Sequence, residues 1–308
     1  MDRLEAMSTF VAVANAGGFS AAARAIGVPL PTVSRRVADL EAALGVRLLT
    51  RTTRRVDLTE QGRTYYAACR RLLDDLRDAD EAVTGEYRAP RGDLVVTAPM
   101  GFGRLHLQPV ALDFLAAYPQ INLRFVLVDR VTNLVEEHID AAIRIADLPD
   151  SSLVARPLGD IRMVVCASPA YLARHGSPRH PEDLRRLDCI VWSALGTAAG
   201  WWFREGGSDR TFPIRTRLTT TMADSAVTAA EAGLGLVQAT SYQVERGVAE
   251  GRLVVVLDEF ECAPTPVSLV YASNRLVPLK LRAFVDFVAP RLHARLQALG
   301  ALVGTGYP

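Results

Sequence analysis

Glycine and proline divide the first 60 residues into short helical segments, and this pattern constrains the fold more than any other feature of the chain. Apolar residues recur at helical spacing within three segments, so we expect helices over residues 3–16, 20–26 and 32–44. Ser20 is expected to cap the second helix, Gly27 to end it, and Pro31 to begin the third. Two short helices joined by a tight turn form a helix-turn-helix, which we predict over residues 19–38.

Positive charge is concentrated in the same region, although the whole chain carries a formal net charge of only +1. Between residues 24 and 55, seven arginines stand against two acidic residues, a local balance of +5. The segment after Gly45 is predicted to form a short two-stranded wing with arginines at its tip. Clustered arginines next to a helix-turn-helix favour nucleic acid as the partner, because phosphates supply the matching negative charge. The alternative is that these arginines form the solvated face of an ordinary helical domain.

Two groups of residues are predicted to contact double-stranded DNA. Side chains at the start of the second helix and in the first turns of the third would face the major groove: Ser20, Pro31, Thr32, Ser34, Arg35 and Arg36. The arginines of the wing would hold the sugar-phosphate backbone and so add affinity more than sequence choice: Arg51, Arg54 and Arg55.

A long helix is expected from about residue 60 to residue 88, and it carries an apolar seam. The seam residues alternate at spacings of four and three, as in a coiled coil: Tyr65, Cys69, Leu72, Leu76, Ala79 and Val83. Charged residues cover the other face of this helix. We interpret it as a dimerisation helix, and the alternative is a helix that packs only on its own domain.

Strand-like apolar runs alternate with helices over residues 92–303, after a linker rich in turn-forming residues. We expect helices over residues 104–117, 133–138, 225–232 and 280–299. Alternation of this kind predicts a parallel sheet with crossover helices on its faces. We predict two lobes joined by two crossings: the first contains residues 92–162 and 266–303, and the second contains residues 163–265.

Several other classes of protein find little support in the sequence. The four cysteines form no CxxC pair, so we expect them to be reduced and mostly buried, with no metal site and no cofactor. No signal peptide and no apolar run of membrane-spanning length are present, which favours a cytoplasmic protein without membrane contact. An enzyme and an exported solute-binding protein are therefore weak alternatives. An architectural DNA-binding protein that does not respond to small molecules is a further alternative.

The N-terminal stretch FVAVANAGGFSAAARAIGVPLPTVSRRVADLEAALGVRLLTRTTRRVDLTEQG carries a specific resemblance to a known family. Four further stretches along the rest of the chain carry a less specific resemblance to the same family: TAPMGFGRLHLQP, LVEEHIDAAIRIADLPDSSLVARPLG, EAGLGLV and VYASNRLVPLKLRAFVDF. Together they resemble the LysR-type transcriptional regulator family from end to end. Such regulators are not enzymes.

The resemblance implies an α/β multidomain chain in three parts. These are a winged helix-turn-helix domain over residues 1–59, a linker helix over 60–88, and an effector domain over 92–303. The effector domain would have the two-lobed type 2 periplasmic-binding-protein fold. The implied partners are promoter DNA, a small-molecule effector, and further copies of the chain in a homodimer or homotetramer, with RNA polymerase as a further candidate.

The effector is expected to bind between the two lobes. Residues 97–103 lie between the first strand and its helix, where a parallel sheet opens a crevice and helix N–H groups can receive an anion. A carboxylate or aromatic effector is therefore expected. The predicted contacts from this stretch and from across the cleft are Thr97, Pro99, Met100, Gly101, Phe102, Asp129, Arg130, Asp147, Trp192, Asp224 and Gln238. Each of these residues could instead serve as a hinge or in packing.

Overall fold

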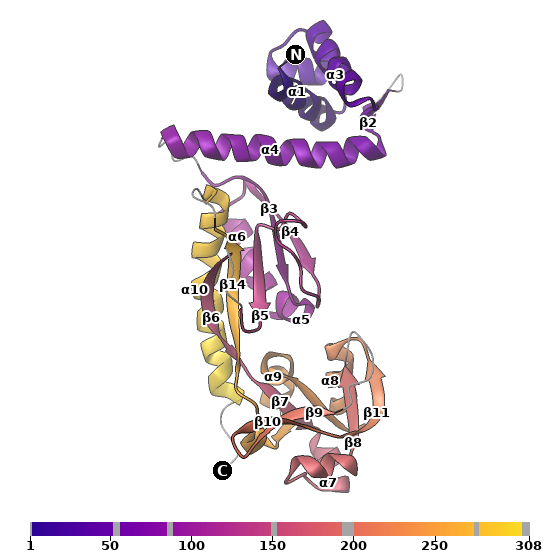
Figure 1. The fold of residues 1–308 in the computed structure, drawn as a ribbon, viewed down its shortest axis with the longest axis vertical. Helices are drawn as coiled ribbons and strands as arrows, with labels where there is room; N and C mark the ends of the chain where they lie inside the picture. Colours follow the sequence, from indigo (N-terminus) through magenta and orange to yellow (C-terminus); the bar gives the residue numbers. More distant parts are fainter. Residues whose placement is uncertain are drawn as a thin grey trace. The chain divides into compact units, whose positions relative to one another are not determined.

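The computed structural model describes residues 2–51, 56–84, 89–148, 153–192, 200–273 and 277–303. The chain divides into two compact units, Met1–Gly92 and Asp93–Pro308. Figure 1 shows the helices of the first unit and the two strand-rich lobes of the second.

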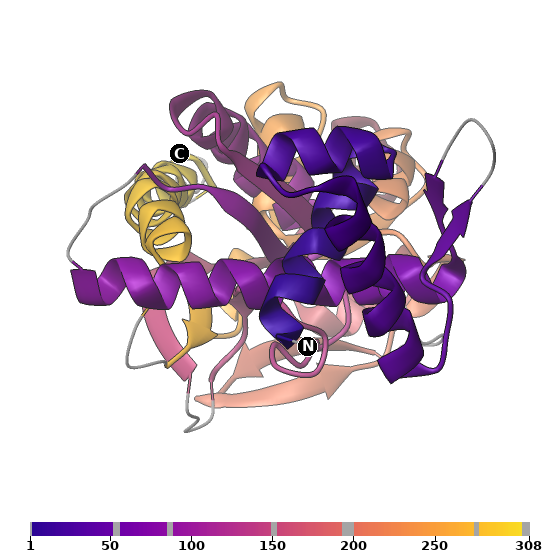
Figure 2. The ribbon, with the colours of Figure 1, turned by 90° about the horizontal axis from the view of Figure 1, so that it is seen from above.

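Three short helices form the body of the first unit: α1 (Arg3–Ala16), α2 (Phe19–Ile26) and α3 (Leu30–Leu44). Their apolar faces meet around Phe10, Val37 and Leu40, all fully buried. Figure 2 shows the three helices packed against one another, with the two wing strands to one side. The predicted helix-turn-helix is therefore present, with a core that is formed by the residues of helical periodicity.

The helix ends follow from local chemistry, and two of the predicted starts are wrong. Gly27 and Gly45 adopt left-handed φ values of 66° and 69° and end α2 and α3, because glycine has no Cβ to clash there. Ser20 does not cap α2: the cap position is Gly18, and Ser20 lies inside the helix with its side chain exposed. Helix α3 begins at Leu30 rather than Thr32, so its first turn includes one residue before Pro31.

The wing consists of β1 (Leu49–Arg51) paired antiparallel with β2 (Val56–Leu58). Glu41 of α3 accepts the backbone N–H groups of Leu48 and Leu49 at 2.7 and 3.0 Å, which anchors the chain as it leaves the helix for the wing. Residues 52–55, the predicted tip, lie outside the described residues.

The long helix of this unit is α4 (Glu60–Thr84). Thr59 begins it: the hydroxyl oxygen accepts the N–H of Gly62 at 2.8 Å. A Cβ on Gly62 would lie 1.9 Å from the carbonyl oxygen of Leu48, so only glycine fits where α4 passes β1. The last four predicted residues of the helix, 85–88, lie outside the described residues.

The first lobe of the second unit, called lobe I, contains a five-stranded sheet in the order β4-β3-β5-β14-β6. The strands are β3 (Gly92–Ala98), β4 (Ile121–Leu127), β5 (Ala141–Ile145), β6 (Leu153–Ile161) and β14 (Thr265–Ala272). Strands β3 and β5 are parallel, whereas β14 runs antiparallel to both β5 and β6. The expected parallel sheet is thus a mixed one, because the chain returns from the second lobe through β14.

Two helical segments cover lobe I. One is continuous from α5 (Met100–Phe102) through the π-helical η1 (Gly103–Leu107) into α6 (Gln108–Ala117). The other is α10 (Leu279–Val303), which packs along β6 (Figure 1). The first begins earlier than the predicted 104–117 because the chain turns into helix directly after Pro99.

Lobe II contains a second five-stranded sheet in the order β11-β8-β12-β7-β13. Its strands are β7 (Met163–Ala167), β8 (Asp188–Trp192), β11 (Arg215–Thr220), β12 (Leu236–Thr240) and β13 (Val254–Val256). Strand β12 is parallel to β8 and antiparallel to β7, so this sheet is mixed as well. The chain passes from lobe I to lobe II between β6 and β7 and returns between η3 (Asp258–Phe260) and β14.

The remaining elements of lobe II are helices and a hairpin. They are α7 (Pro169–His175), the 3₁₀ turn η2 (Pro181–Arg185), α8 (Ala223–Glu231), α9 (Ser241–Ala249), and the hairpin β9 (Trp201–Glu205) with β10 (Ser208–Phe212). Trp201 and Phe203 of the hairpin pack into the core of the lobe, whereas Trp202 is exposed. The helix predicted over 225–232 is α8, displaced by one to two residues.

The helix predicted over residues 133–138 is wrong. That segment is a turn closed by side chains: Asn133 accepts the N–H groups of Val135 and Glu136, and Glu137 accepts the N–H of Asn133. His138 then adopts φ 53°, which no α-helix continues. Asn133 thus caps a single turn, in which the N–H of Glu137 donates to the carbonyl of Asn133 at 3.0 Å. The turn ends at once because the N–H of Ile139 returns to the carbonyl of Leu134 at 2.8 Å, so no helix continues.

In the described part of the chain no single helix is long and apolar enough to cross a membrane. Helices α1 and α2 reach the length and composition only when joined, and they are bent by 119°.

Candidate DNA-binding surface and ligand cavity

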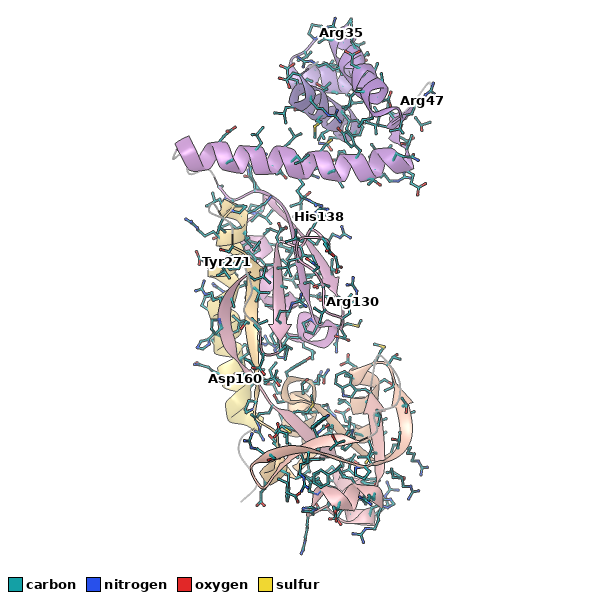
Figure 3. All side chains as sticks on the ribbon, in the orientation of Figure 1. Arg35, Arg47, Arg130, His138, Asp160 and Tyr271 are labelled. Atoms are coloured by element: carbon teal, nitrogen blue, oxygen red, sulfur yellow. The ribbon has the colours of Figure 1, made fainter. Side chains whose placement is uncertain are left out.

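Helix α3 separates a buried face from a polar face. Val33, Val37 and Leu40 point into the core of the winged domain. On the opposite side Arg35 is exposed, and Thr32 and Ser34 are half-buried on the two flanks between Arg35 and the core. Figure 3 shows Arg35 on the side of the winged domain away from α4.

The two neighbouring arginines of α3 differ in their surroundings. Arg36 donates to the Glu5 carboxylate of α1 at 2.5 Å, and its side chain is only 26% exposed. Arg35 makes no salt bridge with any residue that the structure describes. The structure therefore presents Arg35 to a partner, whereas Arg36 would first have to leave Glu5.

The structure describes only some of the other residues predicted to contact DNA. Pro31 is exposed in the first turn of α3, and Ser20 is exposed in the first turn of α2. Arg51 ends β1, but its side chain is outside the description, as are Arg54 and Arg55. Sequence reasoning missed Arg47, an exposed arginine just before the wing (Figure 3). Its position between the helix and the first strand was the available signal.

The predicted seam of α4 divides into two parts. Cys69 is fully buried in the core of the winged domain, and Tyr65 packs against that core. Leu72 and Leu76, one turn apart, are 54% and 42% exposed. The first half of the helix thus belongs to its own domain, and the second half presents an uncovered apolar stripe.

A cavity of about 350 Å³ lies in the second unit, with walls from both lobes. Five of the predicted effector residues line it: Thr97, Pro99, Asp129, Arg130 and Trp192. Other lining residues were not predicted, among them Arg144, Arg162, Tyr242, Gln243 and Thr265. Arg144 stands out in the sequence as a charged residue in an otherwise apolar strand, which is a signal that could have found it. Tyr242 and Gln243 belong to α9, a helix that sequence reasoning did not identify.

Three polar groups of the cavity wall bond within the protein. Thr97 donates to the carbonyl of Val126 at 2.6 Å, and the Trp192 indole N–H donates to the carbonyl of Gln238 at 2.8 Å. Asp129 accepts the backbone N–H of Met100 at 2.8 Å. The helix start that was expected to receive an effector anion is therefore capped by a carboxylate of the protein itself.

The three arginines of the wall are held in different ways. Arg130 forms a two-pronged pair with Glu137 at 2.8 and 2.6 Å. Arg162 forms another with Glu261 at 2.6 and 2.7 Å. Arg144 instead donates to the backbone carbonyl and, at 3.0 Å, to the hydroxyl of Thr132. The Arg130–Glu137 pair holds the turn over residues 129–138 at the cavity wall. The Arg162–Glu261 pair joins the two crossings between the lobes, since Arg162 lies between β6 and β7 and Glu261 lies between η3 and β14.

The remaining predicted effector residues do not line the cavity. Phe102 is buried in the core of lobe I, and Met100 and Gly101 lie beside it at the helix start, with Gly101 close to Gln243. Asp147 is exposed after β5. Two residues are engaged elsewhere: Asp224 pairs with Arg104 of lobe I, and the Gln238 amide donates to the carbonyl of Trp202.

A buried histidine lies where α9 of lobe II meets lobe I. His106 of η1 is 1% exposed, and its ring contacts those of Phe102 and Tyr242 at 5.2 and 5.4 Å between centroids. Its Nδ1 accepts from Arg295 of α10 at 2.9 Å. Burial, and to a smaller extent the charge of Arg295, lower the pKa of His106 to about 4, while a hydrogen bond with the backbone of Tyr242 opposes the shift. His106 is therefore neutral at physiological pH.

The described residues hold no group of three or more histidine, cysteine or acidic side chains placed to bind a metal ion. Cys69, Cys166 and Cys189 are buried and Cys262 is partly buried, all as free thiols. Burial raises the pKa of each thiol, to about 12 for Cys189. Such thiols are poorly nucleophilic, in line with the expectation of reduced, mostly buried cysteines.

A winged helix-turn-helix, a long helix with an uncovered apolar stripe, and a bilobed unit with a cavity between its lobes define a ligand-responsive class of DNA-binding protein. Residues 4–63 match the model of the bacterial regulatory helix-turn-helix protein, lysR family, and residues 88–292 match the LysR substrate binding domain. The chain belongs to the LysR family of transcriptional regulators.

Individual relatives agree over nearly the full length. An HTH-type transcriptional repressor of Pseudomonas aeruginosa is 39% identical over 94% of this chain and 92% of its own. The structure of CrgA from Neisseria meningitidis is 35% identical, covers 94% of this chain and 98% of its own, and superposes with a TM-score of 0.60. The Vibrio cholerae virulence activator AphB is 28% identical over 92% of this chain and 98% of its own, with a TM-score of 0.59.

Proposed function

We propose that this LysR-family regulator binds promoter DNA through α3 and the wing, and that a small carboxylate or aromatic effector in the interlobe cavity modulates the binding. The observation that carries the proposal is the cavity itself, because residues of both lobes form its walls. A ligand that contacts both lobes stabilises one arrangement of them over another, which is the requirement for a switch.

On the DNA side, the proposal rests on the accessible face of α3. Arg35 is exposed and unpaired among the described residues, and Thr32 and Ser34 flank it, half-buried. Arginine in this position can form two hydrogen bonds to guanine, whereas short hydroxyl side chains can contact other bases. The wing arginines Arg51, Arg54 and Arg55 would add contacts to phosphates.

For assembly, the proposal takes the second half of α4 as a contact between copies of the chain in a homodimer, which two dimers could extend to a homotetramer. Leu72 and Leu76 are exposed there at helical spacing. Closure of the lobes would then change the spacing of two winged domains on DNA. The effector must bind the two arrangements with different affinity for this to occur.

The test is DNA binding by the full-length protein with and without small molecules. Purified protein should bind the DNA upstream of its own gene in a gel-shift assay at low salt, and affinity should fall steeply as salt rises. A library of small acids, aldehydes and aromatics should contain compounds that raise the melting temperature and change the footprint length. Binding to DNA with no response to any compound would instead indicate an architectural DNA-binding protein.

A further inference from the structure

We propose that the effector is a monoanion, one carboxylate on an apolar body, and that Arg144 of β5 binds this carboxylate. The inference deepens the proposed function and rests on it, since it names the ligand class of the same cavity. It also places the anion at a different point from the helix start that sequence reasoning favoured.

The helix start is a poor anion site in this chain. The N–H of Met100, at the beginning of α5, already donates to Asp129 at 2.8 Å. An effector carboxylate that accepted this N–H would have to displace Asp129, and one at the adjacent N–H of Gly101 would lie beside the Asp129 carboxylate, two like charges in contact. Repulsion of that kind disfavours binding.

Among the wall arginines, Arg144 is the one whose charge is least compensated. Arg130 and Arg162 each face a carboxylate through two hydrogen bonds. Arg144 forms no salt bridge with any described residue, and its contacts are to the uncharged groups of Thr132. The carboxylate whose charge acts on Arg144 is Glu137, which is already the partner of Arg130. Two guanidinium groups thus share one carboxylate.

An incompletely neutralised cation in a cavity wall favours an anionic ligand. The Arg144 side chain is half-buried, and burial lowers the pKa of its guanidinium, with Glu137 opposing the shift. Removing a charge from water is costly unless an opposite charge or hydrogen bonds replace the water. A ligand carboxylate would supply both, and arginine matches carboxylate geometry with two parallel hydrogen bonds.

The rest of the wall indicates what accompanies the charge. Apolar side chains contribute much of it, from both lobes: Val128, Ile143, Ile145, Ile161, Met163, Trp192 and Tyr242. A second ligand carboxylate would meet Asp129, or an arginine whose charge a carboxylate of the protein already balances. The cavity of about 350 Å³ therefore suits a small aryl or branched alkyl monocarboxylate.

The test uses full-length protein and matched probes. Benzoate, cyclohexanecarboxylate and isovalerate represent monocarboxylates, benzamide is the neutral counterpart of benzoate, and terephthalate is its dianionic relative. Calorimetry and melting-temperature shifts should show binding of at least one monocarboxylate about tenfold or more tighter than benzamide or terephthalate. Arg144→Gln should weaken that binding roughly 10- to 100-fold, the range for loss of a charged hydrogen-bond partner.

Two further variants keep the test decisive. Arg144→Lys retains the charge and should keep part of the affinity, and Arg124→Gln removes an exposed arginine of β4 outside the cavity and should leave affinity unchanged. The melting temperature of each ligand-free variant shows whether it is folded.

The inference is overturned if benzamide or terephthalate binds as tightly as the monocarboxylates, or if folded Arg144→Gln binds them like the unmodified protein. In either case effector-dependent DNA binding can still be present, and the proposed function stands. If DNA is bound but no probe of the three classes or of the wider library shifts the melting temperature, the effector part of the proposed function fails and this inference fails with it.

Discussion

Arginines of the winged domain and of the bilobed unit have opposite surroundings, although they are the same residue type. Arg24, Arg35 and Arg47 in the winged domain are exposed and make no salt bridge with a described residue. In the bilobed unit many arginines face carboxylates, as Arg162 does with Glu261 and Arg130 with Glu137. The surface of the first unit therefore keeps cationic groups available for an external polyanion, whereas the second uses them to hold its own loops and crossings.

The difference shows that arginine content alone does not locate a nucleic-acid interface. Chain-wide, the positive and negative residues nearly cancel. What distinguishes the winged domain is that Arg24, Arg35 and Arg47 form no salt bridge with a described residue, although Asp39 lies one turn from Arg35 on α3 and Glu41 lines the same hollow as Arg47. Arg36, which pairs with Glu5, is the exception. Long-range attraction to DNA depends on this uncompensated charge.

The largest effect is expected at an arginine of the bilobed unit that bonds to a neutral histidine, Arg295 with His106. The pKa of His106 is about 4 in the folded protein against 6.5 ordinarily, so the unfolded state takes up the proton first as pH falls. Stability contributed by neutral His106 is thus full above pH 6.5 and is lost between about 6.5 and 4, by about 3 kcal/mol in total.

Urea unfolding of the bilobed unit within the full chain, followed from pH 7.5 to 4.5, measures this loss. His106→Phe should flatten the pH dependence, whereas His175→Gln, which changes an exposed histidine, should leave it intact. An identical pH dependence in His106→Phe would show that another group is responsible.

The next effect concerns the arginine pairs inside the bilobed unit. Arg162→Met should lower its free energy of unfolding by about 2–3 kcal/mol, because the 11%-exposed Glu261 carboxylate is left without its partner. The matched change Arg156→Met removes an exposed pair with Asp286 and should cost less than about 1 kcal/mol. Urea denaturation compares the two variants, and equal losses would mean that burial does not distinguish these pairs.

On the DNA side, Arg35→Ala should weaken operator binding by about 1–3 kcal/mol if Arg35 contacts a base. Arg36→Ala should have the smaller effect on DNA binding, because Arg36 must give up its bond to Glu5 before it can contact DNA. Partly exposed ion pairs of this kind contribute about 1 kcal/mol or less. Fluorescence anisotropy over a salt series separates lost base contacts from lost phosphate contacts. A larger loss for Arg36→Ala would show that DNA releases Arg36 from Glu5.

The smallest effect is expected at the ion pair between the lobes, Arg104 with Asp224, whose side chains are 53% and 41% exposed. Asp224→Asn should change effector affinity by less than about 1 kcal/mol, since solvent screens both charges. Asp209→Asn, which breaks an exposed pair within the hairpin of lobe II, is the matched control. Calorimetry with a confirmed effector measures both. A change of tenfold or more in Asp224→Asn alone would make this pair a determinant of lobe closure.

Much of the winged domain follows from local sequence. Glycines at 27 and 45 take the left-handed conformation that ends a helix, and apolar residues at helical spacing form the core. These are properties of a few neighbouring residues, so they can be read without the fold. The prediction failed over residues 133–138, where the turn capped by Asn133 ends at His138 with φ 53° and does not continue as a helix.

The cavity could be predicted only in part. Thr97, Asp129 and Trp192 were found because each follows or ends a predicted strand. Arg144, Tyr242 and Gln243 were missed, since their place in the wall depends on how α9 of one lobe meets the strands of the other. That Asp129 caps the expected anion site also depends on a contact 29 residues away along the chain.

By itself the sequence determined the family, the helix-turn-helix and some of the strands, because periodicity, turn residues and motif spacing are properties of neighbouring residues. Strands β6, β9, β10, β11 and β13 were not among the predicted runs. Only the tertiary structure decided which arginine is paired, which carboxylate caps which helix, and which side chains enclose the cavity. The physical reason is that charge compensation and burial are set by neighbours in space, and those neighbours come from segments far apart in the chain.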